Sequence, residues 1–203
     1  MEKKEEEEEN KEVKIILLGE SGVGKTCIIN RYIKNVFISC STSTIGCSSN
    51  KKKILKDDIK YILNIWDTTG QEKYHSLSNL FINGSDIVIL VYAIDSKESF
   101  ANLNYWYNCV KEKLEAQSYI LAVVGSKSDL FDNEEVPEEE GKKYADELKA
   151  RFKLVSAKVD DKGINNLFES LLDEYIEKLS SLKKEKNLDI SYSQRSKKEK
   201  KCC

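Results

Sequence analysis

The sequence has no hydrophobic run long enough to cross a membrane. Its longest apolar stretch, Ile87–Ile94, has far fewer than the ~20 residues that a membrane helix needs. The first ten residues are acidic with no apolar core, which predicts that no signal peptide is present. The six cysteines include no pair with two residues between them, and the single histidine, His75, has no metal-ligand or Ser/His/Asp cluster around it. These absences argue against a zinc site, a secreted disulfide framework and a His-based active site, and they favour a reducing cytosol.

Net charge is also small, because 33 Lys and Arg residues oppose 35 Asp and Glu residues. Nothing in the total therefore predicts binding to nucleic acid. The charges are nevertheless unevenly placed: residues 1–12 hold seven Glu and three Lys, and residues 183–201 hold eight Lys or Arg against three acidic residues. We expect a disordered acidic arm over 1–11, one globular domain over 12–180 and a flexible basic tail over 181–203.

Strand-like and helix-like patterns alternate along the globular part. Apolar runs predict strands over 13–18, 51–56, 59–66, 87–94, 120–124 and 152–155, with a hairpin turn at Asp57-Asp58. Helical spacing predicts helices over 25–34, 97–116, 138–150 and 164–179. The alternation predicts an α/β fold with a six-stranded, mostly parallel sheet and helices on both faces. In such a sheet, ligands bind at the carboxyl ends of the strands.

A phosphate-binding motif follows the first predicted strand. Residues Gly19–Thr26 read GESGVGKT and satisfy G-x-x-x-x-G-K-[ST] between a strand and a helix. Glycines let backbone N–H groups cradle phosphate oxygens, and the helix N-terminus adds partial positive charge. Lys25 would reach the β- and γ-phosphates, and the hydroxyl of Thr26 would bind Mg²⁺. A chance glycine-rich turn is the alternative, which the strand–helix context disfavours. The sequence therefore predicts a P-loop NTPase.

A second motif ends the strand predicted over 59–66. Asp67 can hold Mg²⁺ through water, Gly70 permits close approach of the backbone to a γ-phosphate, and Gln71 can orient the attacking water. On its own, an Asp-x-x-Gly pattern such as Asp67–Gly70 would most often be a surface turn. Behind a phosphate loop it indicates nucleotide hydrolysis.

Together these motifs resemble the Ras superfamily of small GTPases. The motifs GESGVGKT, STIG (Ser43–Gly46), WDTTGQE, GSKSD (Gly125–Asp129) and SAK (Ser156–Lys158) have the order and spacing of that superfamily. The motifs STIG, WDTTGQEKYHSL and the terminal Cys-Cys look like its Rab branch, and the run QEKYHSL followed by VYAIDSKESF is most similar to endosomal Rabs. The resemblance covers about 12–180.

The resemblance implies roles for individual residues. Thr44 would bind Mg²⁺ and sense the γ-phosphate, and residues 36–47 and 68–81 would be the two switch regions. Asp129 would accept the two N–H donors of guanine, which selects against ATP. The implied nucleotide-binding set is Gly19, Glu20, Ser21, Gly22, Val23, Gly24, Lys25, Thr26, Cys27, Thr44, Asp67, Gly70, Ser126, Lys127, Asp129, Ser156, Ala157 and Lys158. The implied Mg²⁺ ligands are Thr26, Thr44 and, through water, Asp67, and the implied catalytic residues are Gln71 and Lys25.

The family also implies a biological role. A Rab-like protein would bind GTP and GDP, hydrolyse GTP slowly without an activator, and act as a membrane-anchored switch in vesicle trafficking. Its partners would be an exchange factor, an activating protein, a prenylation escort or GDI-type chaperone, and effectors, but not nucleic acid. Prenylation of Cys202 and Cys203 would attach it to the cytosolic face of endosomal or other vesicular membranes.

Two other functions compete with this one. One is a nucleotide-binding scaffold, or pseudo-GTPase, that hydrolyses little. The other is a P-loop kinase or ATPase, which Asp129 and the lack of a lid or acceptor domain disfavour.

Three positions depart from the family pattern. Ser126 replaces the usual Asn of the base-reading loop, which predicts weaker nucleotide binding and faster GDP release. Thr69 replaces Ala in the second motif and adds bulk within the second switch. Ser49 replaces an aromatic residue that would join Trp66 and an aromatic near Phe81 in the effector-binding face, which predicts a divergent set of effectors.

Overall fold

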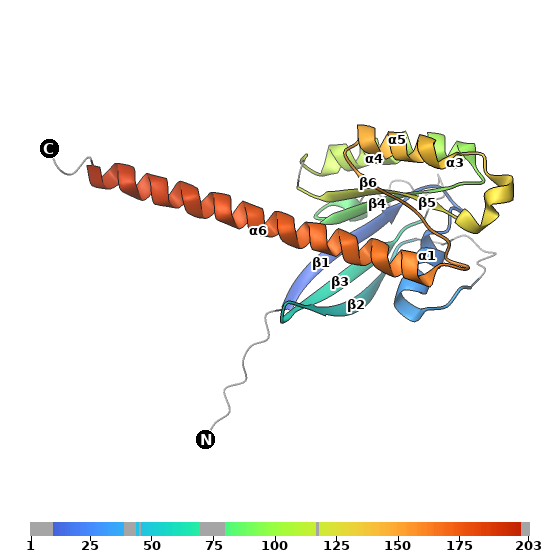
Figure 1. The fold of residues 1–203 in the computed structure, drawn as a ribbon, viewed down its shortest axis with the longest axis horizontal. Coiled ribbons are helices and arrows are strands. Elements are labelled where there is room, and N and C mark those ends of the chain that lie inside the picture. Colours follow the sequence, from blue (N-terminus) through green and yellow to red (C-terminus); the bar gives the residue numbers. More distant parts are fainter. Residues whose placement is uncertain (1–9, 39–43, 45, 70–79, 117, 200–203) are drawn as a thin grey trace, which may run out of the picture.

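A single six-stranded sheet organises the molecule. In the computed structural model, which describes residues 10–38, 44, 46–69, 80–116 and 118–199, the strand order is β2-β3-β1-β4-β5-β6 (Figure 1). The strands are β1 (Asn10–Leu18), β2 (Ser48–Lys56), β3 (Ile59–Asp67), β4 (Ile87–Ala93), β5 (Ile120–Ser126) and β6 (Arg151–Leu154). Only the β2–β3 pair is antiparallel, and the other four pairs are parallel. The prediction of an α/β fold with a mostly parallel sheet is confirmed.

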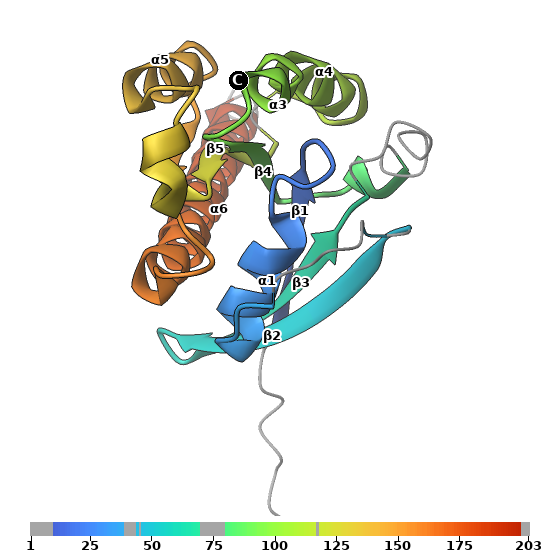
Figure 2. The same ribbon diagram turned by 90° about the vertical axis from the view of Figure 1, so that its right-hand side faces the viewer.

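Helices cover both faces of this sheet. They are α1 (Lys25–Lys34), α3 (Lys97–Ala101), α4 (Leu103–Lys113), α5 (Glu138–Glu147), α6 (Asp161–Glu199) and a short 3-10 helix, η2 (Ser128–Asn133). Figure 2 shows α1 and α6 on one face and α3, α4 and α5 on the other. Because side chains alternate along a strand, β1 divides its apolar residues between two cores. Ile15 and Leu17 join the cluster under α1 and α6, whereas Ile16 and Leu18 join the cluster under α4.

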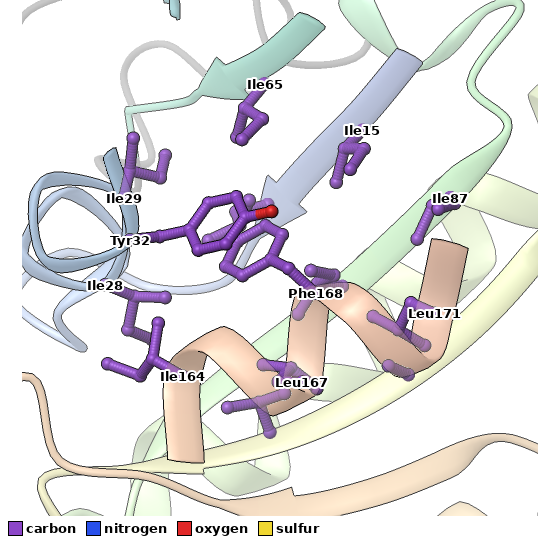
Figure 3. Close-up of a cluster of buried hydrophobic side chains, with 14 of the residues drawn as sticks. Ile15, Ile28, Ile29, Tyr32, Ile65, Ile87, Ile164, Leu167, Phe168 and Leu171 are labelled. Carbon is purple, nitrogen blue, oxygen red and sulfur yellow. The ribbon is translucent and has the colours of Figure 1, made fainter. Parts of the chain in front are cut away.

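An aromatic stack ties α1 to α6 within the first core. The ring centroids of Tyr32 and Phe168 are 3.9 Å apart with an interplanar angle of 8° (Figure 3). Phe168 is fully buried and Tyr32 is nearly so. Helix α1 begins at the phosphate loop, so this stack holds the helix that positions the loop against the rest of the fold.

The predicted hairpin at Asp57-Asp58 is confirmed. Both residues have positive φ, 50° and 59°. Two consecutive left-handed residues form the type I′ turn that matches the right-handed twist of paired strands, and Asp is one of the residues that tolerate this conformation.

Strand β1 starts earlier than its apolar pattern predicts. It begins at Asn10 instead of Val13, so the strand includes the last residues of the predicted disordered arm. Asn10 pairs with Lys60 of β3, and backbone pairing along β3 therefore extends the strand beyond its apolar core. Residues 1–9 of the predicted arm lie outside the described residues.

The segment predicted as a flexible tail is largely helical. Helix α6 continues to Glu199 and projects away from the body of the molecule (Figure 1). No glycine or proline follows Gly163 within the helix, and its second half is rich in Lys, which is a good helix former. The described part of the chain contains no helix that is both long and apolar enough to span a bilayer.

The helix predicted over 97–116 is also divided. Helix α3 ends at Ala101, and α4 starts at Leu103, with Asn102 between them. The side chain of Ser96 caps α3 by accepting a hydrogen bond from the N–H of Ser99. The apolar spacing of the two helices is nearly continuous, which is why the pattern did not reveal the break.

Candidate nucleotide-binding site

The predicted phosphate loop lies between the end of β1 and the start of α1. Gly19 packs so closely against β4 that a Cβ atom would lie 2.1 Å from the carbonyl oxygen of Val91, so only glycine fits there. Gly24 precedes α1 with a left-handed backbone, φ 95° and ψ 16°. These glycines let the chain turn from the strand into the helix, with the helix N-terminus directed at the loop.

Lys25 folds back across this loop. It is 5% exposed, and its Nζ donates hydrogen bonds to the carbonyl oxygens of Gly19 at 2.7 Å and Glu20 at 2.8 Å. Burial lowers the pKa of Lys25 to about 8, although Asp67, Glu20 and Cys47 act in the opposite direction. A bound phosphate would place negative charge beside Lys25 and so would stabilise the charged form of its side chain.

The side chain of Glu20 points away from the loop. Its Oε1 accepts a hydrogen bond from Nε1 of Trp106 in α4, at 3.1 Å. Cys27, in the first turn of α1, donates from Sγ to the carbonyl oxygen of Ile38 at 3.5 Å. Of this predicted set, Ser21 and Gly22 are exposed at the loop surface, and Val23 is buried.

Three oxygen-bearing side chains meet beside Lys25. The hydroxyls of Thr26 and Thr44 are 2.8 Å apart, and Thr26 also hydrogen bonds to the carboxylate of Asp67. Oδ1 of Asp67 is buried without a hydrogen-bond partner among the described residues. Burial raises the pKa of Asp67, while Thr26 and Lys25 oppose that rise. Hydroxyl and carboxylate oxygens are the ligands that Mg²⁺ prefers, and an unpartnered buried oxygen is what a cation or its water would satisfy, so these residues fit the ion.

A pocket of about 540 Å³ continues from the loop toward β5 and β6. Phe37 and Ile28 form part of its apolar lining, together with Leu130 and Ala157. Its charged lining residues are Lys127 and Asp129, which follow β5, and Lys158, which follows β6. The shape and polarity suit a flat base with polar edges.

Two predicted base-reading loops converge at this pocket. Oδ1 of Asp129 accepts a hydrogen bond from the hydroxyl of Ser156 at 2.5 Å, and Nζ of Lys158 lies 3.9 Å from its Oδ2. Lys127 has a left-handed backbone, and its Nζ lies 3.1 Å from Oδ1 of Asp95. The carboxylate of Asp129 is thus held at the pocket by a neighbour from the other loop, with acceptor capacity left for a ligand.

Comparisons with known proteins agree with this geometry. The family model described as "Ras family" matches residues 14–177. The chain belongs to the Ras family. It is 35% identical to the Ras-like GTP-binding protein RYL2 of Yarrowia lipolytica over 186 residues, which is 88% of each chain. It is 36% identical to the Ras-related protein Rab-17 of Homo sapiens over 165 residues, covering 81% of this chain and 77% of Rab-17. It is 35% identical to the Ras-related protein Rab-11C of Dictyostelium discoideum over 178 residues, covering 88% and 79%.

These relatives make the protein a Rab-type small GTPase, which binds GTP and GDP and hydrolyses GTP. The site residues were predicted from motifs, and the structure brings together those that it describes. The predicted catalytic Gln71 and the nucleotide-binding Gly70 lie outside the described residues, as do Cys202 and Cys203.

Some residues of this Ras-family site were missed by the sequence reasoning. Arg31 of α1 donates from Nε to the carbonyl oxygen of Ala157 at 2.7 Å, and so ties α1 to the loop after β6. Asp95 pairs with Lys127 after β4, and Phe37 is a half-exposed apolar residue that lines the pocket. The position of Asp95 after a parallel strand was an available signal, whereas the contact of Arg31 joins segments 126 residues apart.

Ser126 keeps a contact with the phosphate loop despite its short side chain. It is buried, and its Oγ donates to the carbonyl oxygen of Val23 at 2.5 Å. Of the hydrogen bonds that the longer Asn side chain of the family could make, the serine hydroxyl retains at least this one.

Replacing Ser126 by Asn is expected to slow GDP release by about five- to 150-fold, because an Asn can add one or two hydrogen bonds between the loops. The dissociation rate of a fluorescent GDP analogue measures this effect. In the matched variant Ser126→Ala, the loss of the Val23 contact should accelerate release. Equal GDP release rates in all three proteins would contradict a role for position 126 in nucleotide binding.

The other two departures are Thr69, within the predicted second switch region, and Ser49, two residues beyond the predicted first one. Thr69 is fully buried next to Thr68, whose hydroxyl donates to the carbonyl oxygen of Leu17 at 2.6 Å. Ser49 is exposed and pairs with Trp66, and the ring of Trp66 stacks on Phe81 with centroids 4.8 Å apart. The two aromatic residues are therefore in contact, and a small hydroxyl side chain lies beside them.

Proposed function

We propose that this small GTPase is a membrane-anchored switch in intracellular vesicle trafficking. The observation that supports the proposal most strongly is the convergence of three groups in one site: the buried ammonium of Lys25, the unpartnered oxygen of Asp67 and the oriented carboxylate of Asp129. Each matches a different part of a Mg²⁺–guanine nucleotide: phosphate, metal and base.

The phosphates would lie in the loop Gly19–Thr26, with Lys25 close to the oxygens on which negative charge accumulates. Thr26, Thr44 and, through water, Asp67 would hold Mg²⁺, which neutralises phosphate charge when bound. The hydrogen-bond distance between Thr26 and Thr44 supports this role, because Thr44 belongs to the first switch region.

The base would occupy the pocket beside Asp129. Its carboxylate accepts hydrogen bonds only, and guanine presents two adjacent donors where adenine does not. Lys127 would lie along the base and brace its loop, and Ala157 and Lys158 would present backbone and side chain to the base. Ser126 and Ser156 belong to the same two loops. The hydrogen bond from Ser156 to Asp129 supports this arrangement, because it fixes one oxygen of a carboxylate that lines the pocket.

Hydrolysis would proceed by in-line attack of water on the γ-phosphate. Gln71 would orient the water, and Lys25 would stabilise the developing charge. The sequence shows no arginine placed to assist from within the chain, so an activating protein would supply one.

Membrane attachment would use Cys202 and Cys203 as a double prenylation site. Two lipid chains give stable anchoring, whereas one alone is marginal. The neighbouring lysines would add attraction to anionic lipid on the cytosolic face: Lys197, Lys198, Lys200 and Lys201. An escort or GDI-type chaperone, an exchange factor, an activating protein and effectors would control the cycle, on endosomal or other vesicular membranes.

The test expresses the full chain and a Cys202→Ser/Cys203→Ser variant in a eukaryotic cell with a prenylation system. The full chain should carry two isoprenoid groups by mass spectrometry and sediment with vesicle membranes, and the variant should remain in the supernatant. Both proteins should retain GDP or GTP, because the tail is remote from the site. Equal sedimentation of the two proteins would refute the anchoring mechanism.

A further inference from the structure

Arg31, in the last turn of α1, joins two segments that lie far apart in the sequence and that both line the nucleotide pocket. Its Nε donates to the carbonyl oxygen of Ala157 at 2.7 Å, and its Nη2 donates to that of Lys158 at 3.1 Å. Its Nη1 donates to the backbone carbonyl oxygen of Asn35 at 3.2 Å and to Oδ1 of the same residue at 3.3 Å. One guanidinium therefore holds the loop after β6 and the end of α1 together.

The loop after β6 is held from two sides. Arg31 binds the carbonyl oxygens of Ala157 and Lys158. The N–H groups of the same two peptide units, which belong to Lys158 and Val159, donate to Oγ of Ser156 at 3.2 and 3.3 Å. Two consecutive peptide units are thus fixed on their carbonyl side by Arg31 and on their N–H side by Ser156. Neither set of contacts uses the N–H of Ala157.

The bonds to Asn35 fix the opposite side of the pocket. Asn35 ends α1 with a left-handed backbone, φ 52° and ψ 36°, and its N–H donates to the carbonyl oxygen of Arg31 at 2.9 Å. Phe37, which lines the pocket, follows two residues later. The carbonyl oxygen of Ile38 then accepts a hydrogen bond from Sγ of Cys27. The position of Asn35 therefore determines where Phe37 lies.

We infer that Arg31 is a positioning residue that sets the rate of nucleotide release by locking these two sides of the pocket to each other. The inference rests on the proposed placement of the base beside Asp129, which Ser156 links to the loop after β6. A guanidinium presents its N–H donors in a rigid planar fork, so its bonds to the two sides cannot lengthen independently. The base can leave only when one side moves outward, and that movement breaks bonds of Arg31.

This position confines the effect to the base. Lys25 is six residues earlier in α1, or about 9 Å along the helix, so the phosphate loop would keep its contacts when Arg31 is displaced. An exchange factor that displaced this one side chain would loosen both sides of the pocket at once. Loss of Arg31 should therefore affect GDP and GTP equally.

Release of fluorescent analogues of GDP and of a non-hydrolysable GTP from the full chain tests the inference. Replacing Arg31 by alanine should accelerate release of both nucleotides by the same factor, about 10- to 30-fold, because several hydrogen bonds are lost together. Arg31→Lys keeps the charge but reaches fewer acceptors, so its release should be about threefold faster than in the unaltered protein. The matched control is Lys34→Ala, an exposed cation in the same turn, which should leave release unchanged.

Two further measurements separate this role from a general loss of stability. Preloaded GTP should be hydrolysed in a single turnover at an unchanged rate in Arg31→Ala, because the phosphate loop is not disturbed. In the GDP-bound variant, hydrogen exchange should accelerate at the amides of 36–38 and 157–159. The amides of the buried strand β4 should exchange as in the unaltered protein.

Three results would overturn the inference. One is unchanged release from Arg31→Ala. Another is equal release from Arg31→Lys and the unaltered protein, which would show that a cation suffices without the fork. The third is faster exchange in β4 as well, which would make the effect a loss of global stability.

The placement of the base is tested separately by Asp129→Ala, which should weaken GDP binding. Unchanged binding in that variant would refute the proposed site. Weakened binding in that variant, combined with unchanged release from Arg31→Ala, would refute the role of Arg31 alone.

Discussion

Replacing Lys25 by alanine is expected to lower the affinity for GDP and GTP by at least about 100-fold. The ammonium is buried at the phosphate loop, where a charge-assisted contact with phosphate is stronger than an exposed one, and a loss of about 3 kcal/mol corresponds to this factor. Calorimetric titration of nucleotide-free protein with GDP measures it. The exposed-lysine variant Lys142→Ala should bind like the unaltered protein.

The same titration at several pH values separates the charge of Lys25 from its bulk. Burial lowers the pKa of this lysine to about 8 in the empty site, and bound phosphate would raise it again. Below pH 8 the ammonium is already charged, so affinity should be flat. Above pH 8 binding must take up a proton, so affinity should fall by up to about tenfold per pH unit. The Lys25→Ala variant should lack this fall, and a fall of the same slope in the variant would assign it to another group.

Replacing Phe168 by alanine is expected to lower the free energy of unfolding by about 3–5 kcal/mol, because it empties the centre of the core between α1 and α6. The ring is fully buried and stacks on Tyr32 at 3.9 Å (Figure 3). Urea denaturation of the GDP-bound proteins measures the change.

The matched control is Phe131→Ala. Phe131 is 68% exposed, and its removal should change the free energy of unfolding by less than about 0.5 kcal/mol. A similar loss of unfolding free energy in both variants would show that the Tyr32–Phe168 stack does not stabilise the fold more than an exposed ring does.

Much of the fold could be predicted because strong local signals coincide with tertiary structure. The buried strand Ile87–Ala93 is apolar on both faces, and the hairpin at Asp57-Asp58 is specified by two residues that tolerate a left-handed backbone. The break at Asn102 and the early start of β1 at Asn10 could not be predicted in the same way. The early start follows from backbone pairing with β3, which does not change the apolar pattern, and the break at Asn102 separates two helices whose apolar spacing is nearly continuous.

The nucleotide-binding site also combines residues that local motifs predict with contacts that they do not predict. The phosphate loop is contiguous in sequence, so its motif locates Lys25 directly. Contacts between distant segments, such as Arg31 with the carbonyl oxygen of Ala157, have no local signature. The helix predicted over 164–179 continues to Glu199 for another reason: the residues after Leu182 are polar, but they include good helix formers and neither glycine nor proline.

The extension of α6 changes what the C-terminal segment can do mechanically. As a helix, residues 183–199 measure about 25 Å, at 1.5 Å per residue. With the C-terminal lipid anchor proposed above, a coil would only tether the G domain to the membrane, whereas a helix continuous with the core would keep that domain at a set height and limit its tumbling over the bilayer. Effectors would then meet a switch presented at a defined elevation above the headgroups.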